Sequence, residues 1–241
     1  MQILLISLLA FLATFLGGLF ALRFRDKLHL VLGFSAGAII GVAFFDLIPQ
    51  AINLAHTSYD VGQILTYTAI GFIAFMILDR FVLMHSHHTD EHDHGSMTRG
   101  KVGAGSLSIH SFLDGVAIGL AFQVSTAIGA IVTAAVLVHD FSDGINTVNL
   151  ILKNGGEKQQ AYRWLFVDSL APVLGVISTF FFTLPEATLG IVLAIFSGFF
   201  LYIGASDLLP ESHHSHPTYW TTIATILGMS VLYLAIHFAG V

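Results

Sequence analysis

The chain is long, strongly apolar and poor in charge. Of its 241 residues, 55% are hydrophobic and 10% are charged, whereas about a quarter of the residues of soluble domains are charged. This composition excludes an ordinary soluble domain, and the formal net charge of −6 excludes a basic surface for nucleic acid. Because the chain has no cysteine, disulfides, thiolate metal sites and cysteine nucleophiles are excluded too.

Eight apolar stretches predict transmembrane helices. Eight spans of about 20 residues take about 160 residues, which leaves no room for a sizeable soluble domain. The runs are continuous rather than alternating, which argues against the strands of a membrane barrel. The predicted spans cover residues 2–22, 29–54, 61–84, 102–123, 126–152, 161–184, 186–210 and 218–240. We therefore expect an all-α integral membrane protein with a single transmembrane domain over residues 1–241.

The basic residues predict the orientation of these helices. Arg23, Arg25 and Lys27 follow the first apolar run, which fits an uncleaved first helix. All nine Lys and Arg residues lie in or beside the first, third and fifth loops, so the positive-inside rule makes these loops cytoplasmic. Both termini are then expected outside, in a multi-pass protein of the cell membrane, either an inner or a plasma membrane.

Two short matches indicate an inverted internal repeat. The second span contains Gly37, Asp46, Leu47 and Pro49, and the seventh repeats these residue types at an offset of 161. The fourth and fifth spans share the pattern HxFxDG at an offset of 29. Because spans an odd number apart run in opposite directions, we expect three helices, a central pair and three more helices. Such 3+2+3 inverted repeats are typical of secondary transporters with a site at the midplane.

The fourth and fifth spans carry the chemistry of a metal site. His110 and Asp114 are four residues apart, as are His139 and Asp143, so each helix presents an imidazole and a carboxylate on one face. The two candidates that directly follow the histidines, Ser111 and Asp140, could add oxygen ligands.

The carboxylates of these spans require a positive partner. Each ionised carboxylate inside a membrane costs on the order of 3 kcal/mol, and no Lys or Arg occurs between Lys101 and Lys153. The partner is therefore protons or a metal ion, and imidazole with carboxylate suits Zn²⁺, Fe²⁺ or Mn²⁺ better than Cu(I). Interhelical hydrogen bonding and a proton relay are the alternatives.

The sequence as a whole resembles the ZIP (Zrt/Irt-like) family of divalent metal transporters, in its prokaryotic form. HSFLDGVAIG at 110–119 and HDFSDGINTV at 139–148 are similar to the metal-site motifs of that family, and SGFFLYIGASDLLPESHH at 197–214 is similar to its seventh helix. The resemblance implies metal uptake toward the cytoplasm through a site between helices four and five. It also implies that His110, Asp114 and Asp143 hold the principal ion, with Ser111, His139 and Asp140 around it or at a second ion.

Several positions depart from the family pattern. Asp114 and Asp143 stand where the family often has glutamate, Ser111 stands where asparagine is common, and Gln50 replaces a frequent glutamate of helix two. Ala171 rather than glutamate precedes the proline of the sixth span, which puts a complete second metal site in doubt. Asp168, one turn earlier, is an alternative acid or a local polar contact.

Other acids indicate a path for the ion. Asp46 near the outer end of the second span and Asp207 near the inner end of the seventh are related by the repeat and could receive and release the cation. Glu211 would continue the inner exit, and Gln50 and Asp168 complete the candidates for the path. Each of these acids could instead be a solvated group at the end of a span.

A histidine-rich segment lies in the third loop, over residues of about 85–100. The resemblance places it in the cytoplasm, where its histidines would bind metal weakly. These are His85, His87, His88, His92 and His94. A flexible polar connector is the alternative interpretation.

These observations predict a secondary transporter, not an enzyme, that moves a divalent cation into the cytoplasm. Zn²⁺ is the first candidate for the cargo, and Fe²⁺, Mn²⁺ and Cd²⁺ are others; no prosthetic group is expected. The expected partners are the metal cation and the lipid bilayer, a homodimer is compatible with the sequence, and nucleic acid is not a partner. A membrane-embedded zinc-dependent hydrolase or a metal-selective channel are the alternative functions.

Overall fold

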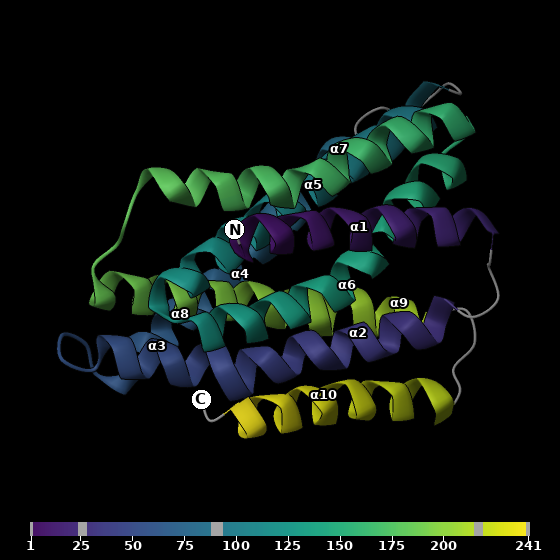
Figure 1. Cartoon of the computed structure of the whole chain (residues 1–241). Coiled ribbons are helices and arrows are strands. Elements are labelled where there is room, and N and C mark those ends of the chain that lie inside the picture. Colours follow the sequence, from purple (N-terminus) through teal and green to yellow (C-terminus); the bar gives the residue numbers. More distant parts are fainter. Residues whose placement is uncertain (1, 24–27, 88–93, 215–218, 240–241) are drawn as a thin grey trace.

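The chain folds into a bundle of long helices (Figure 1). A computed structural model describes residues 2–23, 28–87, 94–214 and 219–239. The helical segments are α1 (Gln2–Arg23), α2 (Leu28–Val42), η1 (Ala43–Leu47), α3 (Ile48–Ala55), α4 (Val61–His87), α5 (His94–Val124), α6 (Thr126–Lys153), α7 (Lys158–Ser178), η2 (Thr179–Phe181), α8 (Glu186–Tyr202), η3 (Ile203–Leu208), α9 (Leu209–His214) and α10 (Tyr219–Ala239). Within the described residues, 8 helical stretches are long and apolar enough to cross a membrane, which confirms the predicted all-α membrane fold.

The helices differ in how much of their apolar surface the bundle covers. Only 22% of the apolar window of α4, and the same share of α10, is buried, against 72% for α6. The exposed positions are large hydrophobic side chains such as Ile77 on α4 and Ile226 on α10. An apolar surface of this extent suits lipid rather than water. Thus α4 and α10 are peripheral helices, and α6 lies at the centre.

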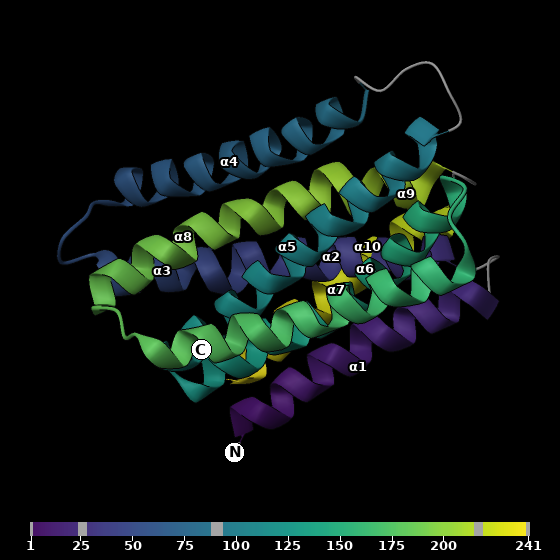
Figure 2. The same cartoon turned by 90° about the horizontal axis from the view of Figure 1, so that it is seen from above.

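The helices form two groups that share the central α6. One group packs α1 against α6 and α7, and α5 against α6 and α7. The other packs α2 against α10, and α8 against α3 and α4, and the contact between α2 and α6 joins the two groups. Figures 1 and 2 show α10 beside α2, and α4 beside α8 at one edge of the bundle.

Close helix crossings reveal the inverted repeat in the second group. A methyl group added to Gly37 of α2 would overlap the carbonyl oxygen of Thr225 on α10, and one added to Gly228 of α10 would overlap that of Phe34 on α2. The contact of α8 with α4 has the same pattern, with Gly198 against Thr68 and Gly71 against Ile195. Gly37 and Phe34 lie 161 residues before Gly198 and Ile195, so the offset seen in the sequence also relates the contacts.

The first group obeys the same symmetry. Gly17 of α1 and Gly144 of α6 each lie against backbone of the other helix, at Phe141 and Thr14. The equivalent contact of α7 with α5 pairs Gly175 with Phe112 and Gly115 with Pro172. Exchanging the first three spans with the last three, and α5 with α6, therefore preserves the crossings, as the predicted 3+2+3 repeat requires.

The second and seventh spans share a widened turn. Asp46 lies in the π-helical segment η1, and Asp207 lies in η3, each shortly before a proline, Pro49 or Pro210. Proline has no N–H and its ring clashes with the carbonyl four residues earlier, so the preceding turn loosens. The repeat thus sets one carboxylate in a π turn of each half.

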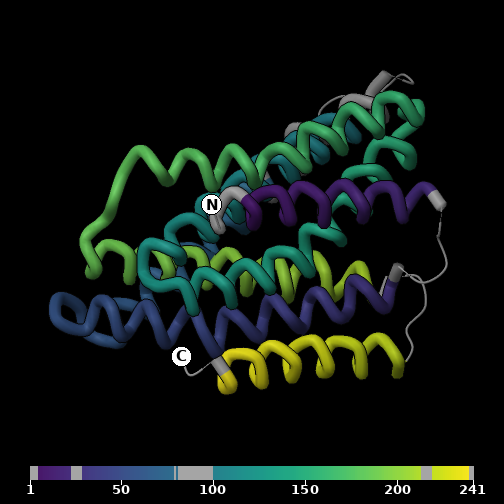
Figure 3. The backbone as a smooth tube through the Cα atoms, in the orientation of Figure 1, coloured from purple at the N-terminus to yellow at the C-terminus, as the bar shows by residue number. Residues whose placement is uncertain are grey.

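The two ends of the described chain lie toward one end of the bundle. Figure 3 shows the first turns of α1 and the last turns of α10 on the same side. An even number of spans gives this result. That this side faces outward remains a prediction from the basic loops.

Candidate metal centre

Four side chains from two helices meet at the centre of the bundle: His110 and Asp114 of α5, and His139 and Asp143 of α6. One ligand atom from each lies within 4.8 Å of the others. The spacing of four residues places the two side chains of each helix on one face. The connection between α5 and α6 is short, because α6 begins directly after Ser125. The Ser125 hydroxyl accepts a hydrogen bond from the Ile128 N–H and so caps the start of α6.

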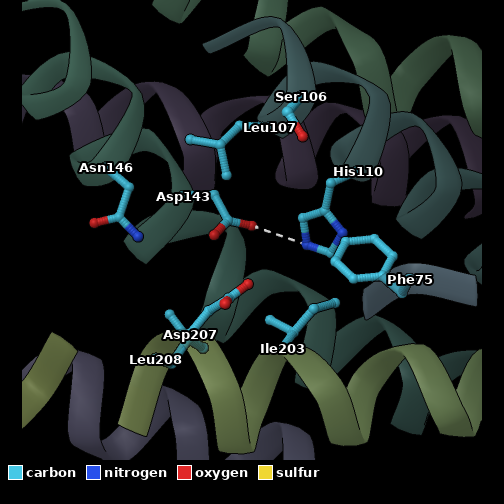
Figure 4. A pocket seen from close by; sticks show the side chains of 9 residues that line it. All are labelled: Phe75, Ser106, Leu107, His110, Asp143, Asn146, Ile203, Asp207 and Leu208. Atoms are coloured by element: carbon cyan, nitrogen blue, oxygen red, sulfur yellow. Dashed lines mark ion pairs between the residues drawn. The ribbon is translucent and has the colours of Figure 1, made fainter. Parts of the chain in front are cut away.

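The distances within this His/Asp cluster are short. Asp114 Oδ2 lies 3.1 Å from His110 Nε2 and 3.3 Å from His139 Nε2. Asp143 Oδ2 lies 3.4 Å from His110 Nε2, an interaction drawn in Figure 4, and 4.0 Å from His139 Nε2. Two nitrogens and two carboxylate oxygens therefore surround one point, as a small cation requires.

The cluster is buried, and its facing atoms make ion pairs with one another but no hydrogen bonds within the described residues. All four side chains are at most 5% exposed. Within the described residues, no hydrogen-bond partner reaches Nε2 of either histidine or Oδ2 of Asp114 or Asp143. Buried polar atoms without partners are costly, and a divalent cation would satisfy all four together.

A hydrogen bond on the far side of one ring prepares it for metal. His139 Nδ1 lies 3.1 Å from the carbonyl oxygen of Ala135, one turn earlier on α6. With Nδ1–H donating to this carbonyl, Nε2 carries the lone pair and points into the cluster. The backbone of α6 thus sets the tautomer that a metal ligand needs.

The structure does not bring Ser111 into the cluster. Its hydroxyl donates to Asp168 Oδ1 of α7 at 2.8 Å, while Thr147 of α6 donates to Asp168 Oδ2 at 2.7 Å. Asp168 therefore joins α5, α6 and α7 immediately beside the cluster. Thr147 was not among the predicted candidates, although its position four residues after Asp143 could have indicated it.

Asp140 lies beside the cluster but outside its four closest atoms. Its side chain is fully buried, and Asp140 Oδ1 is 3.9 Å from His139 Nε2. Neither of its carboxylate oxygens has a hydrogen-bond partner among the described residues. It is thus close enough to influence an ion without being one of the four atoms that converge.

A cavity reaches the cluster (Figure 4). Its walls come from α4, α5, α6 and η3, and consist of Phe75, Ser106, Leu107, His110, Asp143, Asn146, Ile203, Asp207 and Leu208. The polar positions lie toward the start of α5 and the end of α6, which are the ends predicted to be cytoplasmic. Ser106 and Asn146 were missed as candidates, since neither belongs to a charged pattern.

The predicted path residues have unequal environments. Asp207 is exposed at this cavity, and Glu211 is exposed with Oε1 at 3.9 Å from Lys153 Nζ of α6. Asp46 is buried and the neighbouring Gln50 of α3 half-buried, and neither lines the cavity. The structure therefore connects the His/Asp cluster with the inner candidate Asp207 and leaves the outer candidates apart.

The histidine-rich segment is described only in part. Helix α4 continues to His87 and α5 begins at His94, which narrows the connection between them to residues 88–93. His88 and His92 lie outside the described residues, as do the side chains of His85, His87 and His94. Metal binding by these histidines remains a prediction.

Eight helices long and apolar enough to cross a membrane, with a buried His/Asp cluster that could hold a metal ion, define a multi-pass membrane protein. The family model described as ZIP Zinc transporter matches residues 85–235. The chain belongs to this family, which confirms the resemblance seen in the motifs.

Individual relatives are distant but cover much of the chain. A zinc transporter ZupT of Corynebacterium aurimucosum is 27% identical, over 93% of this chain and 92% of the relative. One of Chlorobium luteolum is also 27% identical, over 97% of this chain and 96% of the relative. The match to zinc transporter zipt-7.1 of Caenorhabditis briggsae, at 23% identity, covers only 62% of that protein.

Membership confirms the predicted class of function. The family is one of zinc transporters, not of enzymes, so divalent metal transport is supported and the zinc hydrolase is not favoured. The predicted multi-pass membrane localisation is confirmed as well. The ion, the direction and the residues on the path belong to the proposal that follows.

Proposed function

We propose that this protein is a carrier that moves a divalent transition-metal cation, Zn²⁺ first, toward the cytoplasm through the His/Asp cluster of α5 and α6. The observation that carries the proposal is the convergence, within 4.8 Å, of four buried ligand atoms that have no hydrogen-bond partner among the described residues. The named relatives are zinc transporters, which supports Zn²⁺ as the cargo.

The ligand set supports a borderline transition metal. Two imidazole nitrogens with two carboxylate oxygens suit Zn²⁺, Fe²⁺ and Mn²⁺, while a soft Cu(I) ion prefers thiolate or thioether. Mg²⁺ keeps several waters and seeks oxygen ligands, so two histidines disfavour it. The cargo needs no prosthetic group in this scheme.

The asymmetry of access supports a carrier and its direction. The polar wall of the cavity lies from the cluster toward the start of α5 and the end of α6, where the neighbouring loops are rich in Lys and Arg. Asp207 is exposed at this cavity, whereas Asp46, its counterpart in the inverted repeat, is 1% exposed. A carrier alternates between two such one-sided states, and this one faces the cytoplasm.

The test uses the purified full chain in liposomes loaded with a metal-sensitive dye. Native protein should admit Zn²⁺ with saturable kinetics, whereas His110→Ala and Asp143→Ala should abolish entry and equilibrium binding at matched insertion. Ser108→Ala is the matched control, because that α5 hydroxyl donates to the Ala104 carbonyl of its own helix. Normal Zn²⁺ entry in both cluster variants would reject this site, and Zn²⁺ binding without entry would reject the carrier.

A further inference from the structure

Asn146 occupies a place on the open side of the cluster that the proposed function leaves unexplained. It lies on α6, three residues after Asp143, so both side chains share one face of the helix. Figure 4 shows Asn146 and Asp143 around the same cavity as Asp207, which comes from the facing η3. The amide of Asn146 and the carboxylate of Asp207 thus both line the cavity that reaches Asp143.

Exposure increases in steps along these three residues. Asp143 is buried, Asn146 is half-buried and Asp207 is exposed. The buried Asp143 Oδ2 has no hydrogen-bond partner among the described residues, and the carboxylate lines the cavity. In order of increasing exposure, these three groups of the cavity wall are a carboxylate, an amide and a second carboxylate.

This order of charges suits the release of a tightly held cation. An ion that leaves four buried ligands needs oxygen atoms to replace them before water surrounds it fully. An amide oxygen can do this without adding negative charge. A carboxylate at the same place would hold the ion more strongly and delay its departure, since conduction needs sites weak enough to leave.

We propose that Asn146 forms a second, transient cation position on the release side, shared with Asp143 and Asp207. The ligand is a partly hydrated divalent cation, held by the Asn146 amide oxygen, by the two carboxylates and by water. The inference rests on the proposed function, because it describes the next position of the same ion. It makes Asn146 a determinant of release rate rather than of equilibrium binding at the cluster.

The experiment separates release from binding. Full-length protein is loaded with one Zn²⁺ per chain, mixed rapidly with an excess of chelating dye, and the release rate is compared with liposome transport and equilibrium affinity. Asn146→Leu should slow release and maximal transport about tenfold, the low end of the effect of outer partners in metal sites, with unchanged cluster affinity. Asn149→Leu is the control, since Asn149 is half-buried on the same helix and outside the cavity wall.

A near-isosteric variant tests the charge argument independently of packing. Asn146→Asp should bind a second Zn²⁺ per chain at equilibrium and release it more slowly than native protein. Native release rates in both variants would overturn the proposal, as would loss of cluster binding in Asn146→Leu, which would make Asn146 a cluster ligand. If instead the His/Asp cluster is not the transport site, Asp143→Ala will still bind and transport Zn²⁺. This result differs from those that would overturn the role of Asn146 alone.

Discussion

Asp46 and Asp207 occupy equivalent positions of the two inverted repeats, yet one is buried and the other exposed. Asp46 is 1% exposed, and both its carboxylate oxygens lack a hydrogen-bond partner within the described part of the chain. Asp207 is exposed and lines the cavity that ends at His110 and Asp143. Since the sequence around the two acids is repeated, the difference comes from how the helix groups are arranged.

This difference predicts unequal access to thiol reagents. The chain has no cysteine, so Asp207→Cys and Asp46→Cys each introduce a single reactive group. In the metal-free protein, a membrane-impermeant maleimide should label Asp207→Cys at least about tenfold faster, because opening a buried site to solvent costs free energy. Glu157→Cys, exposed at the start of α7, reports full access to the same side. Equal labelling rates for the two acids would contradict the one-sided arrangement.

Asp140 provides a test of the number of ligands. Its carboxylate is fully buried and has no hydrogen-bond partner among the described residues, so Asp140→Asn should stabilise the metal-free protein by about 1–3 kcal/mol. Thermal unfolding in detergent, with and without Zn²⁺, measures this change. If the four cluster residues hold the ion, Zn²⁺ should still raise the melting temperature of the variant. Loss of the Zn²⁺ effect would show that Asp140 binds the ion directly.

Asp168 should stabilise the fold through the hydrogen bonds that it accepts from two hydroxyl groups. Asp168→Ala leaves the hydroxyls of Ser111 and Thr147 without their acceptor, and we expect a loss of about 2–3 kcal/mol in the free energy of unfolding. Ser169→Ala is the control, since this buried neighbour donates to the Leu165 carbonyl of its own helix. Asp168→Asn keeps one acceptor and should recover part of the stability. An Asp168→Asn variant with native stability but no Zn²⁺ binding would instead make Asp168 a ligand.

The close helix crossings at glycine predict that a glycine-to-alanine change lowers the free energy of unfolding by the same amount in either repeat. A methyl group at Gly37 or at Gly198 would overlap a backbone carbonyl of the facing helix, so either alanine variant should lose about 1–3 kcal/mol of stability. Gly105→Ala is the control, because its nearest neighbours are ring atoms of Trp164 at 3.7 Å. That variant should be neutral or gain up to about 1 kcal/mol from helix propensity. The melting temperatures of the three variants test this prediction. A native melting temperature for Gly198→Ala would argue against the symmetric packing.

The sequence alone determined the features that depend on composition and short spacing. Continuous apolar runs defined the eight spans, because lipid accepts few other patterns. Spacings of four residues placed His110 with Asp114, and His139 with Asp143, because one helical turn repeats nearly every four residues. The common offset that relates Asp46 and its neighbours to Asp207 and its neighbours predicted the repeat from the sequence alone.

Only the tertiary structure decided which side chains face one another across helices. Ser111 follows a cluster histidine directly, but the rotation of α5 turns its hydroxyl to Asp168 of α7. Asn146 has no charge and no motif, and it becomes a candidate only because α6 and η3 enclose a common cavity. Local periodicity gives the face of a helix on which a residue lies. The partner it meets depends on the rotation, depth and crossing of helices far apart in the chain, and close packing of their side chains sets these quantities.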